Sequence, residues 1–122
     1  MVIVPDQSQA LMLRCVLEKP LVLHLYRNDI TPGKIDTARN YEEAQFGGYS
    51  PVALSASGWL WDGNRAKYPD QEFLANGNDS ELVYGYYVTF KENSLLLWAE
   101  RFDTGPAAMN VLGDRLTLAL RI

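Results

Sequence analysis

The chain has 122 residues, of which 48% are hydrophobic and 21% are charged. This composition is typical of a globular protein and excludes an intrinsically disordered chain. Eleven Lys and Arg residues against fifteen Asp and Glu residues give a formal net charge of −4. The basic residues form no cluster that would bind a phosphate backbone, so we expect no nucleic acid as a partner.

The length is close to the commonest size of a single domain, and we predict one domain that spans residues 1–122. No apolar run reaches the roughly 20 residues needed to cross a bilayer, so we expect no membrane association. The first residues lack the basic and long apolar regions of a secretory signal. We therefore expect synthesis in a cytoplasm without export on a signal of its own.

The first predicted element is an amphipathic helix at residues 6–19. Pro5 and Asp6 precede a stretch without Gly or Pro, and Pro20 ends it. In a capping box, the Asp6 side chain would accept a hydrogen bond from the backbone N–H of Gln9.

The helix is predicted to lie on a sheet through its apolar residues. Met12, Cys15, Val16 and Leu17 are the side chains expected on the covered side. Cys15 is the single cysteine, which excludes an internal disulfide and a metal site built from several cysteines. We interpret it as a small buried apolar residue.

Short runs of strand-forming residues follow, separated by clusters of Gly, Pro, Asn and Asp. Their spacing predicts an antiparallel β-sandwich of seven to nine short strands, for which a jelly roll is one possible topology. The last run alternates strictly between apolar and polar residues, which is typical of a half-buried strand. Turns are predicted at residues 62–64 and 76–79. The predicted strands are residues 21–26, 49–56, 59–61, 71–74, 82–90, 95–102 and 115–122.

Residues able to carry out catalysis are few. The single histidine, His24, lies within an apolar strand, where a structural hydrogen-bonded imidazole is the favoured interpretation. No phosphate-binding loop, zinc-protease, nucleophile-elbow or paired-cysteine motif is present. Glu42, Glu43 and Glu100 are the carboxylates nearest to aromatic residues, but nothing in the sequence pairs them as glycoside hydrolysis requires. We therefore predict no enzymatic activity, catalytic residue, cofactor or metal.

The aromatic residues allow three interpretations. Trp59 and Trp61 are two residues apart, so in a strand both rings would face the same side, and Tyr84, Tyr86 and Phe90 share a face in the same way. Such a face serves as a platform for sugars, as part of the core, or as a subunit interface. Core and interface are favoured over the sugar platform.

The order of several motifs resembles small structural proteins of tailed phages, including cyanophages. These motifs are Leu-Tyr-Arg-Asn-Asp-Ile-Thr-Pro at 25–32, Tyr-Glu-Glu-Ala-Gln-Phe-Gly-Gly-Tyr at 41–49, Val-Tyr-Gly-Tyr-Tyr-Val at 83–88 and Leu-Leu-Trp-Ala-Glu-Arg-Phe at 96–102. The resemblance implies a virion protein, and we expect a capsid decoration or cement protein. Such a protein sits on the exterior of the capsid, binds the major capsid protein and often forms a homo-oligomer such as a trimer.

The alternative is a tail or tail-fibre module that binds host glycans through the Trp59 and Trp61 face. Under either hypothesis the contacts would come from aromatic and apolar residues and from long irregular segments. Those segments are the N-terminal residues, 28–48 and 103–112. As edge strands, residues 21–26 or 115–122 would pair with another chain. The candidate interface residues are Tyr26, Ile30, Pro32, Tyr41, Phe46, Tyr49, Trp59, Trp61 and Met109.

Overall fold

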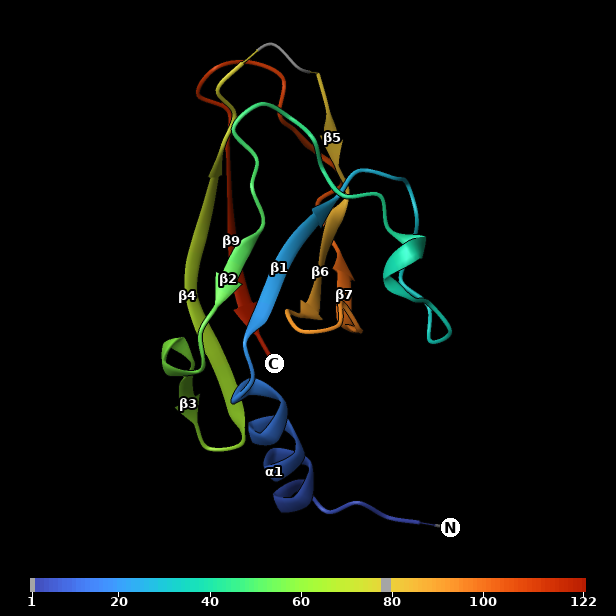
Figure 1. Cartoon of the computed structure of the whole chain (residues 1–122), viewed down its shortest axis with the longest axis vertical. Helices are drawn as coiled ribbons and strands as arrows, with labels where there is room; N and C mark the ends of the chain where they lie inside the picture. Colours follow the sequence, from blue (N-terminus) through green and yellow to red (C-terminus); the bar gives the residue numbers. More distant parts are fainter. Residues whose placement is uncertain (1, 78–79) are drawn as a thin grey trace.

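The computed structural model of the chain describes residues 2–77 and 80–122. One α-helix, α1 (Asp6–Leu17), precedes a series of strands. The helix lies at one end of the long axis, and the strands form the body of the molecule (Figure 1). Two short 3-10 helices, η1 (Ala38–Asn40) and η2 (Ala56–Gly58), lie in the connections. The prediction of a mainly β domain with one N-terminal helix is confirmed.

Two larger sheets and one small strand pair make up the described chain, and every pairing is antiparallel. The first sheet contains, in spatial order, β2 (Val52–Leu54), β1 (Leu21–Tyr26), β6 (Gly85–Phe90) and β7 (Leu96–Arg101). The second contains β3 (Leu60–Asp62), β4 (Arg65–Leu74) and β9 (Arg115–Arg121). The small pair joins β5 (Leu82–Val83) to β8 (Ala107–Ala108).

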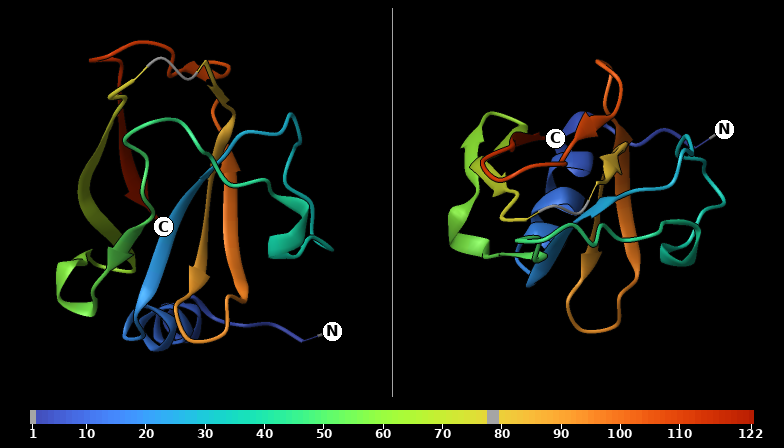
Figure 2. Two further views of the ribbon diagram at one scale, coloured as in Figure 1. Left: turned by 45° about the horizontal axis from the view of Figure 1, so that its top comes forward. Right: turned by 90° about the horizontal axis from the view of Figure 1, so that it is seen from above.

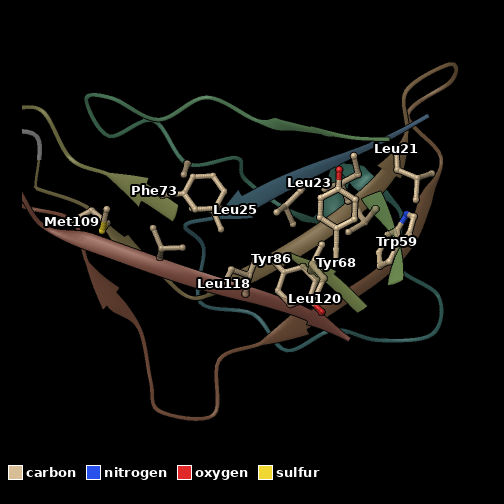
Figure 3. Packing of buried hydrophobic residues seen from close by; sticks show 14 of the residues in the cluster. Leu21, Leu23, Leu25, Trp59, Tyr68, Phe73, Tyr86, Met109, Leu118 and Leu120 are labelled. Atoms are coloured by element: carbon tan, nitrogen blue, oxygen red, sulfur yellow. The ribbon is translucent and has the colours of Figure 1, made fainter. Parts of the chain in front are cut away.

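The core lies between the two larger sheets, as the views from other directions show (Figure 2). Successive residues of a strand point to opposite faces. Leu21, Leu23 and Leu25 of β1 therefore point to the same side, where they are fully buried. Leu118 and Leu120 of β9 enter the core from the opposite sheet (Figure 3). The predicted half-buried closing strand is confirmed.

A second cluster of buried residues covers the outer face of the first sheet. It is formed by Tyr26 of β1, Tyr87 of β6 and Tyr41, which the connection between β1 and β2 places over them. The ring centroids of Tyr41 and Tyr87 are 5.1 Å apart and nearly parallel, and those of Tyr41 and Tyr26 are 5.0 Å apart with the edge of one ring toward the other. Both are favourable aromatic geometries. The first sheet is therefore covered on both faces.

The helix is shorter than predicted and has no side-chain cap. Pro5 is the N-cap residue, and its carbonyl accepts hydrogen bonds from the backbone N–H groups of Ser8 and Gln9. Asp6 is the first helical residue rather than the cap, so its carboxylate is not placed to accept from the free N–H groups of the first turn. The capping-box prediction was wrong for this reason, and the helix ends at Leu17.

The orientation of α1 also differs from the prediction. Leu17 is buried, and Leu13 and Val16 pack against the core. Met12 and Cys15 are exposed. The prediction that Cys15 is buried was wrong, because the covered side of the helix is centred on Leu13 and Leu17 and Cys15 points away from it.

Strand boundaries differ most around proline and glycine. The predicted strand at 71–74 is the last part of β4, which begins at Arg65 and continues through Pro69. Proline cannot donate a backbone hydrogen bond and is tolerated in strands at irregularities, and the pairing with β9 shifts between Tyr68 and Gln71. The run at 82–90 divides at Tyr84 into β5 and β6, and 49–56 shortens to β2. The turn at 62–64 is confirmed between β3 and β4, whereas part of 76–79 lies outside the described residues.

Edge positions decide which strands remain free to pair with another chain. β1 pairs with β2 on one side and with β6 on the other, so the prediction that residues 21–26 join another chain was wrong. β9 and β7 each end the order of a sheet in the described chain. Residues 115–122 therefore include an edge strand, and their pairing with another chain stays a prediction.

Candidate functional site

Five of the nine candidate interface residues lie in the core. They are at most 5% exposed, which leaves them little surface to offer a partner. Large aromatic residues contribute as much contact area to a core as to an interface, so their type alone does not separate the two. The prediction of interface residues was therefore wrong for Tyr26, Tyr41, Phe46, Trp59 and Met109.

The other four candidates are half-buried, and the structure does not bring them together at one site. The Ile30 carbonyl accepts hydrogen bonds from the Tyr26 hydroxyl and from Arg101. Pro32 lines an open groove of about 360 Å³ between its own segment and β7. Tyr49 belongs to a polar chain of residues described below. Trp61 lies beneath the guanidinium of Arg14, 3.9 Å from the ring centroid.

The two tryptophans do not form the exposed pair that sugar stacking requires. Trp59 is 5% exposed and packs edge-on against Tyr68 and Trp98. Trp61 is the half-buried member, and Arg14 of α1 covers one face of its ring. Trp59 immediately precedes β3, and it enters the core instead of pointing outward beside Trp61. The exposed pair of tryptophan rings on which the glycan-binding hypothesis depended is therefore not formed.

A continuous chain of polar contacts crosses the outer face of the first sheet. His24 Nδ1 lies 2.6 Å from Glu43 Oε2, and His24 Nε2 lies 3.0 Å from the hydroxyl of Thr89 on β6. The Tyr49 hydroxyl donates to the same Glu43 oxygen at 2.6 Å and accepts from the backbone N–H of Leu25 at 3.1 Å. The imidazole also stacks on Tyr87 with 4.5 Å between ring centroids.

Backbone pairing brings these residues together although they are distant in sequence. The segment that contains Glu43 continues the edge of β1 beyond β2: Tyr26 bridges to Glu43, and the N–H of Ala44 donates to the Leu25 carbonyl. Between this segment and β2, the Tyr49 hydroxyl takes the place of a strand partner for the Leu25 N–H. The sequence had indicated a structural role for His24, but no local pattern pointed to Glu43, Tyr49 or Thr89 as its neighbours.

Burial and the carboxylate raise the pKa values of the tyrosines around this chain of contacts. The pKa of Tyr49 lies well above its ordinary value, first because the ring is buried and then because its hydroxyl donates to Glu43. Burial, with a further contribution from the Glu43 charge, raises the pKa of Tyr87 to about 12. The neutral phenols are therefore the stable forms in the folded protein.

Glu43, His24 and Thr89 contact one another in the same order as the carboxylate, imidazole and hydroxyl of a nucleophilic triad. Thr89 is only 3% exposed, however, and its hydroxyl lies within a strand beneath the stacked side chains, where no substrate can approach it. The contacts hold the segment between β1 and β2 on the sheet. The prediction that the chain is not an enzyme stays a prediction.

Four exposed aliphatic residues belong to segments at the end of the molecule opposite α1. Leu74 ends β4, Leu82 begins β5, and Val111 and Leu112 lie in the loop before β9; these four residues are here called the apical patch, and they are 44–75% exposed. The Ala75 N–H donates to the Asp114 carbonyl, which joins the end of β4 to the loop before β9. Strand β5 pairs with β8, which precedes the same loop. The end of β4, strand β5 and the loop before β9 all lie at one end of the long axis (Figures 1 and 2).

A carboxylate fixes the loop that carries half of the apical patch. Asp114 Oδ2 accepts hydrogen bonds from the backbone N–H groups of Asn110 and Val111, at 2.9 and 3.0 Å. These two contacts hold the pKa of Asp114 below its ordinary value. Gly113 completes the turn with a φ of 93°, a conformation that other residues rarely adopt. Val111 and Leu112 are therefore presented by an ordered turn.

Among residues 2–77 and 80–122, no group of three His, Cys, Asp or Glu side chains could hold a metal ion. In the same part of the chain, no helix is long and apolar enough to span a bilayer. Comparison with known proteins identifies no relative: no family model, curated protein or solved structure matches the chain.

Proposed function

We propose that this protein is a structural component that binds other protein subunits, and that it decorates the exterior of a tailed-phage capsid. Its partner would be the major capsid protein, whose subunit contacts it would stabilise. The observation that supports binding to protein is the apical patch, and the phage context comes from the resemblance of the sequence motifs. The formal charge of −4 suits a location outside the shell, away from packaged DNA.

The apical patch has the physical properties of a contact surface. Aliphatic side chains contribute binding free energy when they leave water, at roughly 25 cal/mol per Å² of apolar surface. Leu112 is 75% exposed and Val111 is 57% exposed, so most of this contribution is still available. Because Asp114 and Gly113 hold the turn, little conformational entropy would be lost when the patch binds.

Co-sedimentation of the purified protein with capsids of its phage tests this proposal. The variant Val111→Asp/Leu112→Asp places two charges on the apical patch, where burial against a partner would be costly. We expect at least about a tenfold loss of capsid affinity, because each 1.4 kcal/mol corresponds to a factor of ten.

Leu95→Asp is the matched control, because Leu95 is 56% exposed, close to the 57% of Val111, and lies in the turn between β6 and β7, outside the patch. It should bind as the wild type does. Equal binding by the double variant would rule out the apical patch as the contact surface. Failure of the wild-type protein to co-sediment would overturn the proposed function itself.

A further inference from the structure

Strand β9 has an unpaired edge, because it pairs with β4 on one side and ends the order of the second sheet on the other. The backbone groups of Ile122 exchange hydrogen bonds with those of Ala66, so they point toward β4. In an antiparallel pair this direction alternates along the strand. The backbone groups of Thr117, Ala119 and Arg121 therefore point away from β4, and they have no hydrogen-bond partner in the described chain.

Three basic side chains lie together beside this edge. Arg65 and Lys67 are two residues apart on β4, so they point to the same face of the sheet, and Arg121 of β9 lies directly opposite Lys67. All three are exposed, and none forms an ion pair within residues 2–77 and 80–122; they are here called the basic cluster. The other arginine of β9, Arg115, lies 3.6 Å from the Glu72 carboxylate, so the unpaired charge is at the Arg121 end.

The basic cluster surrounds an open groove of about 230 Å³. Its three basic side chains contribute to the lining, together with Asp62 of β3, which lies opposite Arg65. One carboxylate against three cations leaves an excess of positive charge in a chain whose net charge is −4. Like charges directly opposite each other, as Lys67 and Arg121 are, destabilise a strand pair. An acidic partner would offset this repulsion.

We propose that the free edge of β9 binds an extended segment of a partner protein whose acidic side chains contact the basic cluster. The segment would add a strand to the second sheet, a mode of recognition in which backbone hydrogen bonds supply affinity and side chains supply specificity. It would carry an acidic residue opposite Arg121, and the alternate residues would be apolar because they face the same side as the buried Leu118 and Leu120. The basic cluster is at the end of β9 away from the apical patch, so this surface goes beyond the proposed function.

Charge argues against the β9 strand of a second copy as the occupant of this edge. Strand β9 contains two arginines, Arg115 and Arg121, and no acidic residue. In a two-fold antiparallel pair centred on Leu118, Arg115 of each copy would lie opposite Arg121 of the other, which is unfavourable. Edge strands commonly carry charges that prevent such self-association. An acidic strand meets the same arginines with the opposite sign.

The unpaired backbone favours a polypeptide over a nucleic acid. A phosphate backbone would use the positive charges of the basic cluster but would leave the N–H groups along β9 without partners. The net charge of −4 also repels a long polyanion from the rest of the surface. An extended acidic polypeptide satisfies both the cations and the backbone groups.

Binding of a labelled peptide, measured by fluorescence anisotropy, tests this surface. The probe is the peptide Glu-Val-Thr-Val-Thr-Val-Glu, which matches the 7 residues of β9 and places its glutamates opposite Arg121 and Arg115 in an antiparallel pair. We expect this peptide to bind. A peptide with lysine in place of both glutamates should bind at least about tenfold more weakly, because charges of like sign across an interface suppress the wrong partner. Failure of the wild-type protein to bind the acidic peptide would overturn the proposal.

Reversal of one charge in the basic cluster tests which residues make the contact. Arg121→Glu should weaken binding of the acidic peptide at least about tenfold and should strengthen binding of the lysine peptide. Arg39→Glu is the matched control, because it makes the same change of charge at an exposed arginine of η1, and it should bind as the wild type does. Both arginines are exposed, so both variants should keep their fold, which circular dichroism checks. An Arg121→Glu protein with unchanged affinity would contradict the proposal.

N-methylation of the peptide separates strand pairing from attraction between charges alone. In the antiparallel pair, the N–H groups of the two threonines point toward β9 and those of the valines point away. Methylation of both threonine nitrogens should abolish binding, whereas methylation of two valine nitrogens should leave it unchanged. Equal binding by the two methylated peptides would mean that no strand is added. Displacement of the peptide by single-stranded oligothymidine would mean that the basic cluster binds phosphates, and either result would overturn the proposal.

Discussion

Tyr49 makes the contact on which the packing of the loop before β2 depends most. Its hydroxyl accepts from the Leu25 backbone N–H and donates to Glu43, whose carboxylate also accepts from His24. A phenylalanine would keep the ring contacts with Phe46 and Phe73 but would leave the Leu25 N–H without its acceptor.

Tyr49→Phe should therefore lower the free energy of unfolding by about 1–3 kcal/mol, the usual cost of an unsatisfied buried polar group. Chemical denaturation measures this loss. Tyr84→Phe is the matched control: Tyr84 is also half-buried, and no hydrogen bond of its hydroxyl is present among the described residues. If the two variants were equally stable, the polar chain through Glu43 would not contribute to folding.

The raised pKa values of buried tyrosines predict how the free energy of unfolding depends on pH. Burial raises the pKa values of Tyr86 and Tyr87 to about 12 in the folded protein, from 10.0 for a free tyrosine. Between these values, the unfolded chain loses phenol protons that the folded chain keeps, so the unfolded state gains stability. The free energy of unfolding should be unaffected by these groups below pH 10 and should fall as the pH rises from 10 to 12.

Alkaline titration followed by circular dichroism and phenolate absorbance measures this dependence. The pKa values of Tyr26, Tyr41 and Tyr49 are also raised, so Tyr87→Phe removes one of several such groups and should make the decline shallower. A free energy of unfolding that stays constant over this range would show that the two phenols ionise as easily in the folded protein as in the unfolded one.

At the scale of single residues, the sequence predicted the role of a side chain better than its burial. A structural role for His24 followed from its position within an apolar run, and the structure gives it two hydrogen-bond partners. The burial of Tyr41 and Phe46 could not be predicted, because both lie in a segment with no regular strand pattern. Their burial follows from the way this segment folds back over β1.

At the scale of elements, the close approach of β6 and β7 depends on Gly85. A Cβ atom at this position would lie 2.2 Å from the backbone oxygen of Glu100 and 2.7 Å from the ring of Tyr26. The first contact is with backbone in the paired strand, so it cannot be relieved by rotation of a side chain.

Gly85→Ala should therefore destabilise the protein by about 1–3 kcal/mol or more, the range for an overpacked core. Gly77→Ala is the control, because a Cβ atom there would meet nothing within 4 Å in the part of the chain that the structure describes. Thermal or chemical unfolding compares the two variants. A Gly85→Ala protein as stable as the control would mean that β6 and β7 can separate without cost.

Elements with a clear period were predicted well, and elements shaped by tertiary contacts were not. Strict alternation identified β9, and the aromatic runs identified the hairpin of β6 and β7. The full length of β4 was missed because Pro69 and the charged residues around it argue against a strand. Pairing with β3 on one side and β9 on the other extends it nevertheless.

At the scale of the whole molecule, apolar surface lies at both ends of the long axis. The apical patch is at one end, and α1, on which Leu11 and Met12 are exposed, is at the other (Figure 1). This separation would leave the end that contains α1 free if the apical patch binds a shell, as proposed above. The sequence indicated that the chain binds protein through aromatic residues, but the exposed residues are mainly aliphatic, since the aromatic ones pack inside.

Electron microscopy of purified phage particles, with and without this protein, tests the central claim most directly. We predict density on the outer surface of the capsid at junctions between major capsid subunits. That density should disappear when the gene is deleted, and the shells should then break more readily on heating. Density on the tail with normal capsid stability, or particles without any density for the protein, would contradict the account.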